Sequence, residues 1–498
     1  GRSFQRAPNS QLLVPSSQLP CRQFTVNQVI CSSEQFPFNT SVPRLLMPTL
    51  GLLFLNSRKR FSAALFVVVA GFIGSGLPTL LRTWSGRKIP DDFLVVYSAA
   101  RAMLNQVDIY AGTAGMYIYS PFLAFIFQPL AALPERSAAI VWLFSSAAII
   151  FAASLIAARK VTESWRLWQK ETDRSVPWMI SAAALLLSIT KIRSDFTLGQ
   201  YDCLILIGLA GVLWWMDRQP ALAGIIAGAT ANVKYLALIF VPYFLIKRNY
   251  RAAIASTVSF LFFFTLPALE VGLRPIKTYA INAIAVLNKV AGVPEWISLT
   301  ATDRSHKPVV NSITWDHSVS LTSSILRLTR SHGVSDFIGA SLIVVLFATI
   351  VTAIVLIGRR NGVKLFQPAT AKTASSHPGA GTIEWAALIV LALIFGPQTT
   401  ARHMIFLILV YTVAMAIVFA QKQRAPQIVL IASMVATAVA LSLPFRDTGH
   451  HPSLIALKSI GAASWCAVIL ILAMVWIGTR TISETTSEPG QKPVVSDQ

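Results

Sequence analysis

Two adjacent carboxylates, Asp91 and Asp92, interrupt a strongly apolar part of the chain, in the segment SGRKIPDDFLVVYSAARAMLNQVDIYAG (residues 85–112). The apolar residues that follow them recur every three to four positions, the spacing of an amphipathic helix. A carboxylate at such a place has two uses. It accepts hydrogen bonds from amides of the first helical turn, as a cap, or it takes a proton from a reacting hydroxyl, as a general base. Spacing alone favours the cap.

The elements that position this pair belong to a membrane protein. The 498 residues are 54% hydrophobic and only 13% charged, which is too few charges to cover a water-soluble protein of this size. Apolar runs of roughly 20 residues, the length that crosses about 30 Å of hydrocarbon, recur from residue 61 to residue 477. Isolated strands would leave backbone groups unpaired in lipid, so these runs predict helices. The predicted fold class is all-α, a polytopic membrane protein with about twelve transmembrane helices.

The net charge of +21 comes largely from Lys and Arg in short loops between the apolar runs. This distribution is typical of cytoplasmic loops and does not favour nucleic-acid binding. The basic residues 58–60 precede the first span, so the loop with Asp91 and Asp92 is expected on the extracytoplasmic side. The predicted spans are 61–81, 137–158, 178–190, 201–216, 220–232, 234–246, 252–268, 337–357, 384–396, 403–420, 427–443 and 454–477.

The remaining segments divide the chain into three parts. Residues 1–57, rich in Ser, Pro and Gln near the start, are expected to be disordered or interfacial. Residues 58–480 form the predicted transmembrane domain, with extracytoplasmic loops at 82–116 and 269–336, and residues 481–498 form a disordered cytoplasmic tail. The proline-rich segment 116–134 suits a re-entrant or interfacial hairpin, although a further crossing stays open.

The charged residues favour an enzyme over a transporter. Ion-coupled transport needs ionisable groups near the middle of the membrane, and the predicted spans contain almost none. The acidic and imidazole groups outside the cytoplasmic loops gather at one face, as expected for an enzyme that acts on a lipid-linked substrate. A transporter or flippase of lipid-linked sugars is the alternative.

Four segments together resemble glycosyltransferase family 87. They are, in chain order, DDFLVVYSAARAMLNQVDIY, YIYSPFLAFIFQPLAALP, LGQYDCLILIGLAGVLWW and LAGIIAGATANVKYLALIFVPYFLIKRNYRAA. The resemblance covers about residues 90–420 and rests on the order of the segments. It implies a C-type membrane glycosyltransferase that uses polyprenyl-phosphate sugars, typically polyprenyl-phosphate mannose.

The resemblance further implies that Asp92 is the general base. An inverting transfer needs one carboxylate to take the proton of the acceptor hydroxyl as it attacks the anomeric carbon. The phosphate leaving group needs no paired acid, unlike the leaving group of a glycosidase. Asp91 is expected either to assist by raising the pKa of its neighbour or to be merely solvated.

A leaving phosphate requires positive charge beside it. The candidates are Lys234, where the family usually has Lys-Pro, together with Arg402 and His403 in FGPQTTARHM, and Arg193. The alternative for Lys234, less favoured than the phosphate contact, is a lysine that snorkels to the membrane surface. Arg402 with His403 is equally consistent with a pair of interfacial anchors.

Further polar residues complete the predicted site. Gln200 in LGQ is expected to contact substrate, as is Tyr97 on the helix after Asp92. His317 is expected to orient the acceptor or to assist Asp92. Asp316 either contacts substrate or caps the next helix, and Trp315 either stacks on a sugar or belongs to the aromatic belt.

No cofactor is predicted. A divalent cation is conceivable at the Asp pair but is not supported, because no second acidic cluster with ligand spacing is visible. The four cysteines lack the spacing of a disulfide framework or a zinc site. The expected function is transfer of a hexose, mannose being the expected sugar, to a glycan or glycolipid acceptor. The expected location is the extracytoplasmic face of the plasma membrane.

Overall fold

The structure is a computed structural model. It describes residues 57–110, 117–167, 175–290, 313–315, 317–368, 379–397, 399–443, 456–457 and 459–487. Within these ranges the regular structure is helical, and β-pairing is limited to one isolated antiparallel bridge between Ser318 and Thr400. The all-α fold class is therefore confirmed. Residues 1–56, predicted as disordered or interfacial, lie outside the described part.

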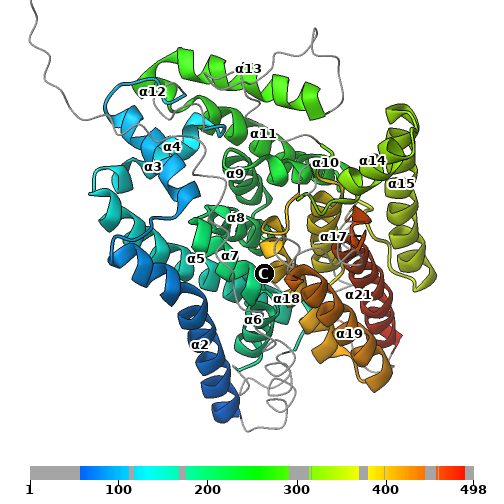
Figure 1. The fold of residues 1–498 in the computed structure, drawn as a ribbon. Coiled ribbons are helices and arrows are strands. Elements are labelled where there is room, and N and C mark those ends of the chain that lie inside the picture. Colours follow the sequence, from blue (N-terminus) through cyan, green and yellow to red (C-terminus); the bar gives the residue numbers. More distant parts are fainter. Residues whose placement is uncertain are drawn as a thin grey trace, which may run out of the picture.

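Most of the predicted spans coincide with helices, and further helices lie between them. Figure 1 shows their arrangement. Their bounds are α2 Ser57–Trp84, α3 Asp91–Leu104, α4 Pro121–Ala131, α5 Glu135–Ser164, α6 Val176–Leu187, α7 Ile189–Leu198, α8 Asp202–Trp215, α9 Pro220–Ala231, η3 Tyr235–Ile239, α10 Phe240–Ile246, α11 Tyr250–Thr265, α12 Ala268–Val271, α13 Leu273–Val290, α14 Leu321–Ser331, α15 Asp336–Arg360, α17 Ala380–Phe395, η4 His403–Phe406, α18 Leu407–Ala420, α19 Arg424–Ser442 and α21 Ala462–Ser487.

Seven helical segments of the described chain are long and apolar enough to cross a membrane, and an eighth is counted if the bent pair α6–α7 forms one span. The chain is therefore a multi-pass membrane protein, but the count of about twelve is not confirmed. The difference lies in short apolar helices such as α8 and α9, with 14 and 12 residues. At about 1.5 Å per residue they fall short of roughly 30 Å of hydrocarbon. The 11-residue helix α4, in the proline-rich segment, is likewise too short to cross.

The core of the bundle surrounds η4 and α18, whose span is 78% buried, whereas the spans of α2 and α15 are 17% and 11% buried. Figure 1 shows α2 and α15 on the outside of the bundle. Glycines allow the closest packing, between α9 and α11. A Cβ atom on Gly224 or Gly228 would lie 2.2 Å from the carbonyl oxygen of Ala252 or Ser256, respectively. Small residues spaced four apart allow such close approach of helices in membranes.

The turn after α7 brings two distant parts of the chain together. The pair α6–α7 bends by 66°, and α7 ends at Gly199 in the left-handed conformation, with φ +67°. A Cβ atom at Gly199 would lie 2.7 Å from the Cβ atoms of Pro90 and Phe93. Glycine is therefore required here for both conformation and space. Because Gly199 approaches Pro90 and Phe93 so closely, the next residue, Gln200, lies beside the start of α3.

Two predicted boundaries change in the structure. Helix α21 continues to Ser487, so residues 481–487 are helical rather than part of a disordered tail. The polar end is supported by an ion pair four residues apart, Arg480 to Glu484 at 2.8 Å. The segment 269–336, predicted as a long loop, contains α12, α13 and α14.

Candidate active site

The side chains of Asp91 and Asp92 are not helix caps. They are the first two residues of α3, the N-cap is Pro90, and no side chain caps this helix. Asp92 Oδ2 instead accepts hydrogen bonds from Gln200 Nε2 and, at 3.0 Å, from Arg402 Nη1. The cap interpretation of Asp92 is therefore wrong, because its carboxylate is directed at residues far away in the chain.

A second ion pair lies in the same cluster. Lys234, in the turn between α9 and η3, pairs through its Nζ atom with Asp202 Oδ1 at the start of α8. The Lys234 ammonium also lies 4.9 Å from the centre of the Tyr201 ring, which suits a cation–π contact. The snorkelling interpretation of Lys234 is wrong, because the ammonium is directed to a buried carboxylate.

A third carboxylate, Asp195 on α7, completes the cluster. Its side chain is buried and interacts electrostatically with Asp92, Asp202, Lys234 and Arg402. Several buried polar atoms here have no hydrogen-bond partner within the described ranges: Asp195 Oδ2, Asp202 Oδ2, Gln200 Oε1 and Arg402 Nε. Buried polar atoms are almost always paired in folded proteins. This concentration of free donors and acceptors therefore suits a polar ligand.

The pKa of Asp92 is raised, which favours proton uptake by its carboxylate. Burial raises the pKa of its carboxyl group, and the charges of Arg402 and Lys234 oppose this shift without cancelling it, so that the pKa lies above its ordinary value. Beside it, burial raises the pKa of Tyr119 to about 12. Tyr119 therefore stays neutral, and its ring meets that of Tyr201 edge-on at 4.8 Å.

The structure brings together five of the predicted site residues: Asp92, Gln200, Lys234, Arg402 and His403. His403 lies close enough to Lys234, Asp202 and Arg402 to interact with their charges, and its Nδ1 accepts a hydrogen bond from the Thr400 amide at 3.2 Å.

Two predicted residues point elsewhere. Asp91 is 62% exposed and faces Lys88 at 3.4 Å. Its negative charge nevertheless contributes to the raised pKa of Asp92, as expected for a helper of that residue. The hydroxyl group of Tyr97 donates to the carbonyl oxygen of Leu133 at 2.9 Å and accepts from Arg101, so it ties α3 to the end of α4.

The remaining predicted residues neighbour members of the cluster, either along the chain or across the bridge between Ser318 and Thr400. Arg193 is half-buried on α7, two residues before Asp195. The rings of Trp315 and His317 stack at 4.8 Å, in a segment that pairs with Thr400, close to Arg402. Asp316 lies outside the described residues. It is not the N-cap of α14, because that position belongs to Ser320, whose side chain accepts from the Ser323 amide.

Sequence reasoning missed Asp195 and Asp202. Asp202 follows LGQY directly and begins an apolar helix, which was a usable signal for a buried, paired carboxylate. Asp195 lies seven residues earlier, on the short polar helix α7. From its sequence this helix is expected to face solvent, and only the bend after α6 shows that Asp195 is buried. The expectation that the spans lack ionisable groups was therefore incomplete.

A metal site is not evident in the cluster. Among the described residues, no three or more His, Cys, Asp or Glu side chains are grouped so that they could hold a metal ion. Lys234 and Arg402 instead supply the positive charge next to the carboxylates. The absence of a cofactor stays a prediction.

Comparison with known proteins identifies glycosyltransferases that are similar to this chain. A curated α-(1→3)-arabinofuranosyltransferase of Corynebacterium glutamicum is 25% identical over 234 residues, which are 43% of this chain and 53% of that protein. A polyprenol-phosphate-mannose-dependent α-(1→2)-phosphatidylinositol pentamannoside mannosyltransferase of Mycobacterium tuberculosis is 27% identical over 160 residues, 31% of this chain and 34% of that protein. The chain thus spans about half the length of the first relative and a third of the second. No solved structure matches it.

The match to a family model is broader. The model of glycosyltransferase family 87 matches residues 117–376, about half of the chain. This range contains Gln200, Asp202 and Lys234 but begins after Asp92 and ends before Arg402. The chain belongs to glycosyltransferase family 87.

Proposed function

We propose that this protein transfers a hexose from a polyprenyl-phosphate sugar to an extracytoplasmic glycan or glycolipid acceptor, with inversion and with Asp92 as general base. Mannose is the proposed sugar, and the plasma membrane is the proposed location. The observation that carries the proposal is the contact of Asp92 Oδ2 with Arg402 at 3.0 Å. It puts a base of raised pKa beside a cation suited to a leaving phosphate.

Exposure separates Asp92 from the other two carboxylates of the cluster. The side chain of Asp92 is 28% exposed, whereas Asp195 and Asp202 are buried. An acceptor hydroxyl must come within hydrogen-bond distance of the base. Asp92 is therefore the carboxylate that an acceptor reaches, and Asp202 serves to hold Lys234 in place.

The cations of the cluster suit the donor phosphate. Arg402 is 31% exposed and Lys234 is 20% exposed, so both are accessible to a phosphate group. When the phosphate binds, Arg402 exchanges part of its contact with Asp92 for the ligand. Because the charge of Arg402 lowers the pKa of Asp92, this exchange strengthens the base.

The reaction then proceeds in one displacement. Asp92 takes the proton of the acceptor hydroxyl, and the oxygen attacks the anomeric carbon. The bond from this carbon to the phosphate oxygen breaks, and its electron pair leaves with polyprenyl phosphate. Arg402 and Lys234, with His403 beside them, stabilise the growing negative charge on the phosphate.

One relative supports the donor class, and the two relatives differ in the sugar that their names give. The mycobacterial relative is named as dependent on polyprenol-phosphate mannose, and the corynebacterial relative as an arabinofuranosyltransferase. We keep mannose as the proposed sugar and make arabinofuranose the principal competitor in the test.

The test is a transfer assay with purified protein in proteoliposomes. Each donor is supplied singly with a panel of glycolipid acceptors: polyprenyl-phosphate mannose, polyprenyl-phosphate glucose or polyprenyl-phosphate arabinofuranose. Nucleotide sugars serve as comparison donors. The Asp92→Asn variant serves as the inactive control. We expect a glycosidic product from the mannosyl lipid, with its anomeric configuration inverted by NMR. Transfer from nucleotide sugars alone would contradict the proposal, as would movement of lipid-linked sugar across the bilayer without any product.

A further inference from the structure

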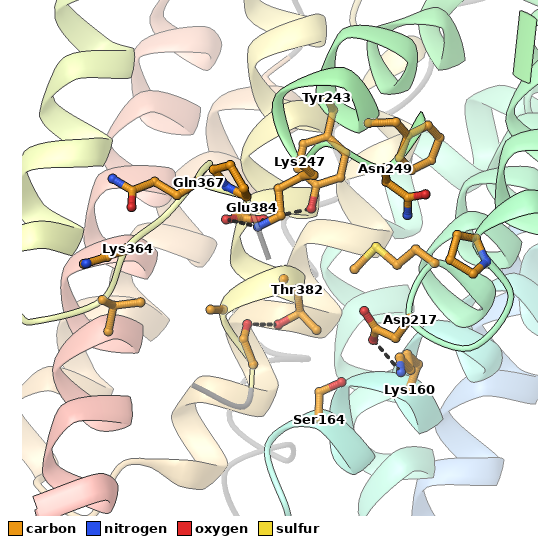
Figure 2. Close-up of a pocket in the computed structure, with 18 of the residues that line it drawn as sticks. Lys160, Ser164, Asp217, Tyr243, Lys247, Asn249, Lys364, Gln367, Thr382 and Glu384 are labelled. Carbon is orange, nitrogen blue, oxygen red and sulfur yellow. Dashed lines mark hydrogen bonds and ion pairs between the residues drawn. The ribbon is translucent and has the colours of Figure 1, made fainter. Parts of the chain in front are cut away.

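A cavity of about 650 Å³ lies beyond the end of α8 that is far from Asp92. Figure 2 shows side chains that line it. Helix α8 connects the candidate active site to the cavity. It begins at Asp202, in the candidate active site, and Asp217, just beyond its end, lines the cavity. Fourteen helical residues span about 21 Å. The cavity has the size of ordinary ligand pockets, which range from about 300 to 1,000 Å³. It is therefore a separate candidate site.

The carboxylates that line this cavity are already paired. Lys160, whose side chain is 6% exposed, contacts Asp217 at 2.9 Å, and Lys247 contacts Glu384 at 3.0 Å. Figure 2 shows both pairs at the cavity wall. The third carboxylate, Glu163, contacts Arg218 at 2.7 Å. Because each has its own cation, the carboxylates do not neutralise the rest of the lining.

Two further cations and two amides remain. Arg166 and Lys364 line the cavity, and neither has an ion-pair partner in the part of the chain that the structure describes. Asn249 caps α11 through its Oδ1 atom, which leaves its amide nitrogen available, and Gln367 adds a second amide. The lining thus offers an excess of positive charge and hydrogen-bond donors, which is the composition of an anion site.

The backbone around the cavity is unusual. Non-glycine residues with positive φ border it in three turns: Arg166 at +50°, Arg248 at +56° and Phe366 at +56°. Such conformations cost about 1 kcal/mol or more each and gather at functional sites. Arg166 lines the cavity itself, whereas Arg248 and Phe366 are chain neighbours of the lining residues Lys247 and Gln367.

We propose that this cavity binds the phosphate group of an anionic ligand, independently of the Asp92 cluster. A phospholipid headgroup and a soluble phosphate share this chemistry. A lipid source fits the surroundings, because Leu245 and Ile246, directly before Lys247, are 48% and 52% exposed, and Ile254 on α11 is 63% exposed. Basic pockets between membrane helices bind such headgroups.

The experiment measures lipid retention by native mass spectrometry of the full-length protein. Phosphatidylglycerol is titrated, phosphatidylcholine serves as the comparison lipid without net charge, and inorganic phosphate is added as competitor. The test variant is Arg166→Gln/Lys364→Gln. The matched control is Arg360→Gln/Arg424→Gln, which removes two exposed charges that do not line the cavity. Arg402→Gln tests whether the lipid binds beside Asp92 instead.

We expect the test variant to bind phosphatidylglycerol about thirtyfold more weakly, since each basic residue near the surface contributes about 1 kcal/mol. The control and Arg402→Gln variants retain wild-type binding, and thermal unfolding shows that all are folded. Displacement by inorganic phosphate would identify a soluble phosphate as the source, and resistance to it a lipid. The proposal is overturned if neither probe binds, if both double variants lose binding equally, or if Arg402→Gln alone abolishes it.

Discussion

Asp92 and Glu384 are two ion-paired carboxylates toward opposite ends of the same helix bundle, and they differ in how completely they are satisfied. Glu384 is 1% exposed and accepts from Lys247, from the Tyr243 hydroxyl at 2.8 Å and from the Phe366 amide at 2.5 Å. Asp92 is 28% exposed and accepts from Gln200 and Arg402. A buried and fully paired carboxylate gives stability, whereas a partly open one beside unpaired polar atoms is available for chemistry.

The two pairs also differ in what their helices do. Glu384 lies within the first turns of α17, where its partners hold the ends of neighbouring helices together. Asp92 lies where short or bent helices end: α7, α8 and α9 all begin or stop beside it. Helix ends inside a membrane protein leave backbone groups and side chains free to meet a substrate.

The largest expected effect tests whether Asp92, the partly exposed carboxylate, is the general base. Asp92→Asn should lower the transfer rate about a thousandfold, because a general base contributes roughly 10²- to 10⁴-fold, while thermal stability stays close to wild type. The matched control is Asp336→Asn, which alters another first-turn aspartate paired with an arginine. Asp91→Asn should retain most of the activity, because this side chain faces Lys88. Near-normal transfer by Asp92→Asn would remove the base assignment.

The Glu384→Gln variant tests whether the buried, fully paired carboxylate contributes to stability. Loss of the carboxylate charge leaves Lys247 unpaired at a largely buried position, so the free energy of unfolding should fall by about 3 kcal/mol. Glu484→Gln, which breaks the exposed pair with Arg480, should cost less than about 1 kcal/mol. Thermal unfolding in matched detergent measures both. Equal small losses would mean that the Glu384 pair is not a stability element.

The third prediction concerns the pH dependence of transfer. Transfer requires the deprotonated base, so kcat/KM should fall on the acid side around the pKa of Asp92, which lies above its ordinary value of about 3.9. The charge of Arg402 lowers this pKa, so Arg402→Gln should move the acid limb to higher pH. It should also lower kcat/KM by about tenfold to a hundredfold.

The control for this profile is Arg330→Gln, which removes an exposed arginine paired with Asp336. Its acid limb should coincide with that of the wild type. A limb of Arg402→Gln that stays in place or moves to lower pH would mean that Arg402 does not act on the titrating group.

The smallest expected effect tests whether the close approach at Gly199 positions Gln200 against Asp92. Gly199→Ala should destabilise the protein by about 2 kcal/mol, because the new Cβ atom adds strain at positive φ and a clash with Pro90 and Phe93. Gly272→Ala, with φ +73° and open space around the Cβ position, isolates the conformational cost of about 1 kcal/mol. Transfer should fall for the first variant and not for the second. Equal effects would show that the close approach does not position Gln200 against Asp92.

Much of the site was predictable because some signals are local. A pair of carboxylates after a span, a lysine in a turn and an Arg-His pair are visible in the residues around Asp92, Lys234 and Arg402. Their convergence was not visible, since Gln200 and Arg402 lie 108 and 310 residues from Asp92. Asp202 and Asp195 were missed for the same reason. A carboxylate at a helix start looks solvated until the tertiary structure shows what covers it.

The sequence by itself determined the class of the protein, because hydropathy acts residue by residue: a chain with so few charges must fold as helices in a membrane. It also determined where most helices lie and which of the polar residues to suspect. Only the tertiary structure decided how many helices are long enough to span and which carboxylates are buried. It also decided that the bend after α6 and the contact at Gly199 bring Asp92, Gln200 and Arg402 together. These properties depend on packing between distant segments, which no local pattern encodes.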